Sequence, residues 1–151
     1  MRLSARVDYA LRAMAELAAA DEGPVKSEFI AASQGIPPRF LERILGELRR
    51  SGMVASQRGA DGGYWLARPA HAISLADVIR AIEGPLAEIH GTRPEGTNYR
   101  GAATAYQEVW IALRASERRI LETVSLADIA TGSLPAEIDA LTGDPEAWLP
   151  H

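Results

Sequence analysis

The sequence of 151 residues contains no cysteine. This absence excludes disulfide scaffolds, thiolate metal sites, cysteine nucleophiles and thiol redox sensing. No stretch approaches the ~18 consecutive apolar residues of a membrane span, and the charged start of the chain lacks the apolar run of a signal peptide. With 47% hydrophobic and 24% charged residues the composition is that of an ordinary globular protein. We therefore expect a soluble, cytoplasmic chain.

Lysine is nearly absent as well: Lys26 stands alone beside fifteen arginines. The formal net charge of −4 is unevenly spread. Residues 1–70 carry ten basic and eight acidic residues, whereas residues 71–151 carry six and twelve. Within residues 37–58, five arginines face only two glutamates. A GC-rich genome would explain the preference for arginine, but it would not explain the clustering, and arginine suits phosphates and guanine edges.

The first half of the chain predicts three helices and a hairpin. Apolar spacing of three and four residues predicts a helix over 4–20 with Ser4 as its N-cap. A short helix over 26–33 is expected to place Phe29 and Ile30 in the core. Pro37 and Pro38 open a third helix over 38–51, and its predicted apolar face comprises Phe40, Leu41, Ile44, Leu45 and Leu48. Two strands, 53–57 and 64–67, flank a tip with three glycines in six residues.

The second half predicts a long helix between loops. Ser74 begins a capping box and a helix through about Ile82. Residues 84–101 form the longest loop signal, and a helix over about 102–124 follows. Its stripe suits a dimer seam and contains Tyr106, Trp110, Leu113 and Ile120. Ser125 begins a second capping box, and after Gly132 we expect a turn-rich tail that Trp148 ties down.

This order of elements predicts a winged helix-turn-helix. The fold class is mainly α with a small β wing, extended by a long dimerisation helix. The 38–51 helix would offer Arg39, Glu42 and Arg43 to the major groove, while Arg58 would carry charge at the base of the wing. Each charged residue taken alone would equally suit a solvated surface. The interpretation as a DNA-binding domain therefore depends on all these elements occurring together in this order.

The chain resembles the bacterial Rrf-type (BadM/IscR/NsrR/CymR-like) winged-helix regulators over roughly residues 1–132. The most specific match is the wing, Arg58-Gly59-Ala60-Asp61-Gly62-Gly63-Tyr64. Further matches are Met1-Arg2-Leu3-Ser4, Tyr9-Ala10-Leu11-Arg12, Gly35-Ile36-Pro37, Phe40-Leu41-Glu42, Leu48-Arg49-Arg50-Ser51-Gly52-Met53-Val54, Ser74-Leu75-Ala76-Asp77-Val78-Ile79, Glu83-Gly84-Pro85 and Ser125-Leu126-Ala127-Asp128-Ile129.

The resemblance implies a homodimer that grips an inverted repeat of double-stranded DNA. It implies base contacts from the 38–51 helix, a minor-groove contact from Arg58, and phosphate contacts from Arg2 and Ser4. Pro37, Gln57, Gly59 and Gly62 complete the implied interface. The implied organisation is a DNA-binding domain at 1–83, a sensor-type loop at 84–101, a dimerisation helix and turn at 102–132, and a tail at 133–151.

The chain departs from this family in its loop. Many members hold an iron–sulfur cluster with cysteines there, and this chain has none, so a cysteine-ligated cluster is excluded and no cofactor is expected. His90 with Glu88 and Glu95 could in principle serve a metal, but a lone loop histidine is more typical of a solvated residue. The signal is then a small effector walled by Tyr99, Tyr106 and Trp110, a protein partner, or abundance alone; those aromatic residues equally suit core and dimer contacts.

The sequence therefore predicts a dimeric, sequence-specific transcriptional repressor. The alternative is a winged-helix module that binds a partner protein, which the acidic second half would suit. No Ser-His-Asp arrangement, phosphate loop or paired-acid cleft is evident, so no enzyme is expected.

Overall fold

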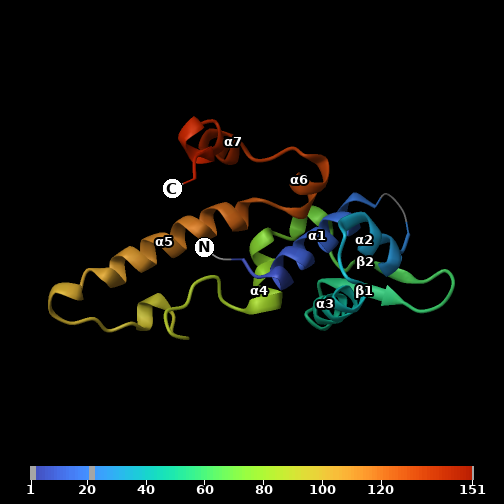
Figure 1. Cartoon of the computed structure of the whole chain (residues 1–151), viewed down its shortest axis with the longest axis horizontal. Coiled ribbons are helices and arrows are strands. Elements are labelled where there is room, and N and C mark those ends of the chain that lie inside the picture. The colour runs from blue at the N-terminus through green and yellow to red at the C-terminus, as the bar shows by residue number, and fades with distance from the viewer. Residues whose placement is uncertain (1–2, 21–22, 151) are drawn as a thin grey trace.

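The structure is a computed structural model that describes residues 3–20 and 23–150. It is mainly helical with one two-stranded antiparallel sheet, as predicted (Figure 1). The helices are α1 (Ala5–Ala19), α2 (Ser27–Gln34), α3 (Pro38–Arg50), α4 (Leu75–Glu83), α5 (Tyr106–Thr123), α6 (Leu126–Thr131) and α7 (Ala136–Thr142). The strands are β1 (Val54–Gln57) and β2 (Gly63–Leu66). Within the described residues, no helix combines the length and apolarity that a membrane crossing needs.

Helix α1 forms the centre of the core. Ser4 caps it by accepting a hydrogen bond from the Val7 amide at 3.2 Å, which satisfies one of the free amides of the first turn. The buried side of α1 packs against α3, α4 and α6, which closes the N-terminal head around one apolar cluster. Full burial of an aliphatic side chain such as Met14 contributes about 1.5–3 kcal/mol, so this cluster is the main stabilising feature of the head.

Helices α2 and α3 form the predicted helix-turn-helix. Gly35 ends α2 in the left-handed conformation, with φ of 60°, which glycine adopts without steric cost. Pro38 opens α3, where its missing N–H is not needed. The buried residues of α3 follow a helical stripe: Leu41, Ile44, Leu45 and Leu48.

Two predicted core residues lie on the surface instead. Phe29 and Phe40 are 60% and 57% exposed. Each directly precedes a fully buried residue, Ile30 or Leu41, and adjacent positions of a helix point about 100° apart. A narrow core contact therefore takes only one of the two side chains, and the branched aliphatic residue occupies it in both helices.

The wing is the β1–β2 hairpin, paired in register from Val54 opposite Leu66 to Gln57 opposite Gly63. A third segment joins it that was not predicted: the backbone of Val25 exchanges two 2.8 Å hydrogen bonds with Tyr64. Next to it, Nζ of Lys26 donates to the carbonyls of Gly59 at 3.0 Å and Ala60 at 2.5 Å. The only lysine of the chain thus holds the glycine-rich tip against the start of α2.

The second half follows the predicted order with one shifted boundary. Both capping boxes are formed, at Ser74 and Ser125. The long helix α5 begins at Tyr106, because residues Gly101–Ala103 form a separate 3-10 turn. Its 18 residues span about 27 Å. In Figure 1, α5 reaches away from the head, and the loop after α4 runs beside it.

The tail contains a helix that was not predicted. Residues after Gly132 form α7 and a 3-10 turn over Pro145–Trp148. Trp148 does not anchor the tail to the core as expected: its side chain is 73% exposed, and its Nε1 donates to the Thr142 carbonyl at 2.7 Å. The tail meets α5 through an ion pair between Arg119 and Glu137.

Candidate nucleic-acid interface

The exposed face of α3 carries the charged residues that were assigned to the major groove. Arg39, Glu42 and Arg43 are all exposed, while the opposite side of the helix is buried in the core. Pro37 precedes the helix as its N-cap residue and is exposed as well. At this end Pro38 has no N–H, and the amides of Phe40 and Leu41 donate to the Pro37 carbonyl. The helix dipole and the Arg39 side chain, and not a row of free amides, therefore favour a phosphate here. The face is therefore accessible and chemically suited to a nucleic acid.

A chain of contacts ties this helix to α1 and α4. Nε of Arg43 lies 3.5 Å from Glu47, and the same carboxylate accepts a 2.6 Å hydrogen bond from Arg6. The hydrogen bond from Arg6 holds the pKa of Glu47 below its usual range, so this carboxylate stays ionised at neutral pH. Arg6 also donates to the Ile82 carbonyl at 3.3 Å, near the end of α4. Sequence reasoning missed Arg6 and Glu47, because the pair spans 41 positions.

The wing presents Gln57, Arg58 and Gly59 at exposed positions. Gly62 differs from the expectation, because it is buried. A Cβ atom at Gly62 would lie 2.1 Å from the carbonyl oxygen of Gln57. This glycine therefore serves close packing inside the tip, and it offers no surface to a ligand.

The remaining predicted phosphate contacts lie at the start of α1. Ser4 is half-buried, and its hydroxyl is engaged in capping the helix. Arg2 lies outside the described residues. A further contact connects α3 with the wing: Arg49 donates to the Ser56 hydroxyl at 3.3 Å. The clustering of arginines in residues 37–58 indicated that this region is functional, but it did not predict the hydrogen bond between Arg49 and Ser56.

Helix α5 exposes an apolar stripe that differs from the predicted one by one residue. Tyr106, Val109 and Leu113 are each at least half exposed, and Ile120 is partly exposed. Their spacing of three, four and seven is that of a coiled-coil seam. Trp110 instead turns toward its own chain, where its Nε1 donates to the Tyr99 hydroxyl at 2.9 Å and its ring stacks on Tyr106. We call Tyr106, Val109, Leu113 and Ile120 the α5 stripe.

The loop of residues 84–105 packs along the other side of α5. Gln107 fastens it by donating to the carbonyls of Pro94, Glu95 and Thr97. The aromatic residues Tyr99, Tyr106 and Trp110 contact one another. Trp110 lines a cavity of about 260 Å³, and its lining includes neither of the two tyrosines. His90 is exposed, with an unusual φ of 52°. Within residues 3–20 and 23–150, no three His, Asp or Glu side chains are placed to hold a metal.

These elements define the class of protein. The fold combines a buried α1, an α2–α3 helix-turn-helix with an exposed charged face, and a β hairpin beside it. This combination is that of a winged-helix transcriptional regulator. The family model described as Rrf2, iron-dependent transcriptional regulator, matches residues 3–132. The chain belongs to the Rrf2 family.

Relatives and solved structures agree with this assignment. The chain is 50% identical to the Mycobacterium tuberculosis protein Rv1287, which is named as a provisional HTH-type transcriptional regulator. The match extends over 145 residues and covers 95% of this chain and 90% of that protein. The regulator CymR of Bacillus subtilis is 34% identical over 132 residues, which cover 87% and 91%.

The fold is similar to that of CymR, the global cysteine regulator of B. subtilis, with a TM-score of 0.76, 32% identity, and coverage of 89% of this chain and 99% of that one. It is also similar to IscR of T. potens, with a TM-score of 0.72, 33% identity and 91% of both chains covered.

The family description mentions iron, but the donor set of this chain does not fit an iron–sulfur cluster. Such clusters are held by cysteine thiolates, with histidine as an occasional substitute for some of them. The chain has no cysteine. In the loop, His90, Glu88 and Glu95 do not gather into a ligand set. The chain therefore lacks the thiolate ligands that an iron–sulfur cluster requires.

Proposed function

We propose that this chain is a sequence-specific repressor that binds an inverted repeat of DNA as a homodimer. The two-sided helix α3 carries the proposal: four aliphatic side chains are buried on one side, and Arg39, Glu42 and Arg43 are exposed on the other. Arginine suits guanine and glutamate suits the amino group of cytosine, so this face has the chemistry to read base edges. The exposed Arg58 on the wing adds a contact to the backbone or minor groove.

The α5 stripe supports a second copy of this chain as the partner. Side chains as large as Tyr106, Val109 and Leu113 rarely stay exposed in a row without a partner. Their heptad spacing allows two α5 helices to pack against each other. A two-fold dimer would present two α3 helices related by symmetry, which matches the two halves of an inverted repeat.

The DNA-binding proposal is tested with a site obtained by in vitro selection from random duplexes on the purified protein. Arg43→Ala and Arg58→Ala should each weaken binding to the selected site by about 1–3 kcal/mol, measured by fluorescence anisotropy. Arg119→Ala is the matched control, because Arg119 lies on α5 and pairs with Glu137 in the tail. Affinity should also fall steeply with salt.

Unchanged affinity in both α3 and wing variants would refute the assigned interface. Failure to select any duplex would favour the alternative, in which the winged helix binds a partner protein. Repression itself is tested with a reporter behind a promoter that contains the selected site. Expression should rise when the gene for this chain is deleted, and a fall would identify an activator.

The dimer proposal is tested by introducing a charge into the α5 stripe. Leu113→Glu should convert the dimer to a monomer in multi-angle light scattering, because a buried unpaired carboxylate is costly. Ile111→Glu is the control, since Ile111 is an exposed apolar residue of α5 outside the stripe. A dimer that survives Leu113→Glu, or that Ile111→Glu breaks equally, would refute the seam.

We further propose that the signal reaching this regulator is not a cysteine-held cluster. The composition supports this, because thiolate ligands are lacking throughout the chain. Protein purified under strictly anaerobic conditions from cells grown with iron should show no charge-transfer absorption in the visible range. Stoichiometric iron and sulfide with such a spectrum would overturn the proposal.

A further inference from the structure

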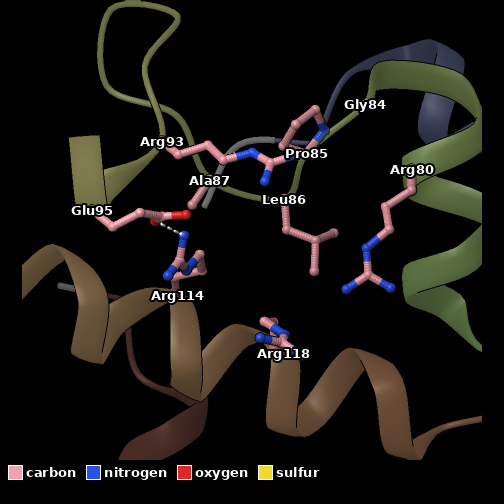
Figure 2. A pocket seen from close by; sticks show the side chains of 9 residues that line it. All are labelled: Arg80, Gly84, Pro85, Leu86, Ala87, Arg93, Glu95, Arg114 and Arg118. Carbon is pink, nitrogen blue, oxygen red and sulfur yellow. Dashed lines mark hydrogen bonds and ion pairs between the residues drawn. The ribbon is translucent and has the colours of Figure 1, made fainter. Parts of the chain in front are cut away.

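A second cavity lies between α4, the loop after it and α5. It has a volume of about 430 Å³ and is lined by nine residues (Figure 2). Four of them are arginines, drawn from three separate segments: Arg80 on α4, Arg93 in the loop, and Arg114 and Arg118 on α5. Pro85, Leu86 and Ala87 supply an apolar wall. We call this cavity the arginine pocket.

The charges of the arginine pocket are only partly balanced. Arg114 pairs with Glu95, the one acidic residue in the lining. Glu122 at the edge pairs with both Arg80 and Arg118, the latter at 3.1 Å. In the part of the chain that the structure describes, Arg93 forms no ion pair. Arg80 has a second, longer contact, 4.0 Å to Asp77. Four guanidinium groups thus share three carboxylates around a space large enough for a small molecule.

The arrangement differs from an ordinary surface network of ion pairs in its geometry. The arginines approach the cavity from three directions, as Figure 2 shows, with Leu86 pointing into the space among them. Each guanidinium has five N–H donors in a planar fork, so one carboxylate leaves most of its donors free. Such forks bind phosphate and carboxylate groups through paired hydrogen bonds.

We propose that the arginine pocket binds a small organic anion that carries two or more phosphate or carboxylate groups. Its volume lies in the range of small-molecule sites, which is about 300–1,000 Å³. Oxyanion groups would bind between Arg93 and the arginines of α5, and a short carbon skeleton would contact Pro85 and Leu86. The residues of α5 that line the site, Arg114 and Arg118, are different from those of the α5 stripe.

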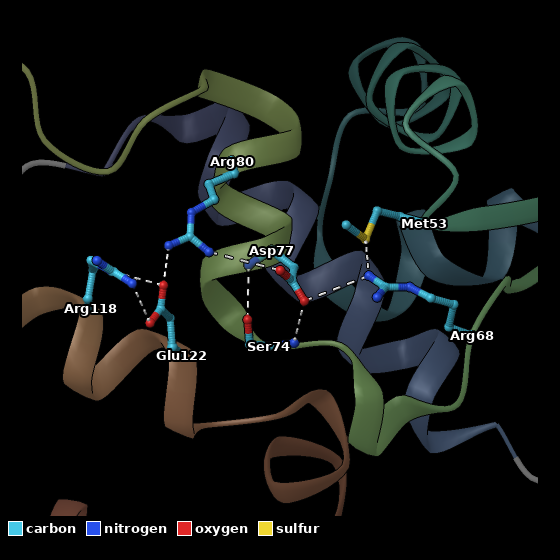
Figure 3. A network of polar contacts seen from close by, with 7 residues as sticks. All are labelled: Met53, Arg68, Ser74, Asp77, Arg80, Arg118 and Glu122. Atoms are coloured by element: carbon cyan, nitrogen blue, oxygen red, sulfur yellow. Dashed lines mark hydrogen bonds and ion pairs between the residues drawn. The ribbon is translucent and has the colours of Figure 1, made fainter. Parts of the chain in front are cut away.

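The arginine pocket is connected with the DNA-binding head through Arg80 (Figure 3). On one side Arg80 pairs with Glu122, and on the other it lies 4.0 Å from Asp77. Asp77 in turn lies 3.7 Å from Arg68, which follows β2 of the wing and donates to the Met53 sulfur at 3.6 Å. An anion that draws Arg80 into the pocket would weaken its contact with Asp77 and so alter the packing at the base of the wing.

The test measures ligand binding to DNA-free protein, so its outcome is independent of the proposed repressor function. Isothermal titration with pyrophosphate and, separately, citrate is carried out at an ionic strength matched with potassium chloride. We expect saturable binding of at least one anion at about one site per chain. Arg93→Gln and Arg118→Gln should each weaken it at least about five-fold, because each removes a charged fork.

Three matched controls keep the result specific. Arg100→Gln removes an exposed arginine from the same loop, Arg119→Gln one from the same helix, and Arg43→Gln one from the DNA-binding face. Each should change the affinity by less than about two-fold. Preference for pyrophosphate would identify a phosphorylated ligand, and preference for citrate a polycarboxylate. No saturable binding of either anion, or an equal loss in any control, would overturn the proposal.

Discussion

Gly62→Ala should destabilise the protein, although it adds only one methyl group to the wing. A Cβ at this position lies 2.1 Å from the Gln57 carbonyl oxygen and 2.7 Å from the Arg58 carbonyl carbon. Since ordinary carbon contacts lie at about 3.5 Å, one side of the tip must move by about 1 Å. The contacts are with backbone, which no change of rotamer can relieve.

The size of the effect follows from what the movement breaks. The tip is closed by a 3.1 Å hydrogen bond from Gly62 to Gly59, whose carbonyl also accepts from Lys26. Overpacking a closely packed site costs about 1–3 kcal/mol. Because the tip is exposed and can shift outward in part, we expect a loss of about 1–2 kcal/mol in the free energy of unfolding.

Gly46→Ala is the matched control with the opposite expected sign. Gly46 lies inside α3, and a Cβ there meets only the Arg50 guanidinium, at an ordinary 3.6 Å. Replacing glycine by alanine in a helix interior stabilises it by about 0.5–1 kcal/mol. Both variants are compared with the parent protein by urea denaturation at one fixed protein concentration, because dimerisation makes the apparent stability depend on concentration.

The reasoning would be refuted if Gly62→Ala were as stable as the parent protein or gained stability as Gly46→Ala does. That result would show that the tip relaxes freely and that the short Cβ distance has no energetic consequence. An unchanged denaturant slope is required for the comparison, since a change in slope would indicate an altered unfolded or native state.

Two further predictions concern side-chain contacts of the head. The pKa of Glu47 is lowered from 4.5 by its hydrogen bond with Arg6, so its stabilising effect is complete above pH ~5 and is lost as the pH falls through the lowered value. Thermal melting between pH ~5 and ~3 should therefore show a smaller loss of stability in Glu47→Gln than in the parent, and parallel curves would contradict this. Ser125→Ala should cost about 1 kcal/mol, because the Ser125 hydroxyl caps α6. This loss is measured by urea denaturation. Ser133→Ala is the control, because Ser133 is exposed, and it should leave the free energy of unfolding unchanged. Equal losses in the two variants would argue against the cap.

Most elements of the head could be predicted from the sequence, because their boundaries are set by local chemistry. The capping boxes at Ser74 and Ser125 satisfy free amides within three residues, and Gly35 and Pro38 end and begin helices by their own backbone preferences. The same locality explains the exposed face of α3. Once the aliphatic stripe is buried, Arg39, Glu42 and Arg43 must lie on the other side.

The sequence-based prediction was wrong where two neighbouring apolar side chains fitted the same pattern and only one of them could be buried. Phe40 and Leu41 are both apolar neighbours, and only the packed head decided that Leu41 is buried. On α5 the sequence-based dimer stripe includes Trp110 and does not include Val109; the dimer contacts themselves stay a prediction. The hydrogen bond from Trp110 to Tyr99 draws the indole toward the loop, and Val109 takes the exposed position. Helix α7 lacked a capping or apolar signal strong enough to be recognised.

By itself, the sequence determined the helical segments, the glycine-tipped wing, the cationic face of α3 and the absence of thiolate ligands, because each depends on residue chemistry or on neighbours within one or two turns. Only the tertiary structure decided which distant residues meet. Arg6 reaches Glu47, and Arg80 and Arg93 come together with two arginines of α5. Such meetings depend on the path of the whole chain and on the packing of α4 against α1 and α5, which no local pattern encodes.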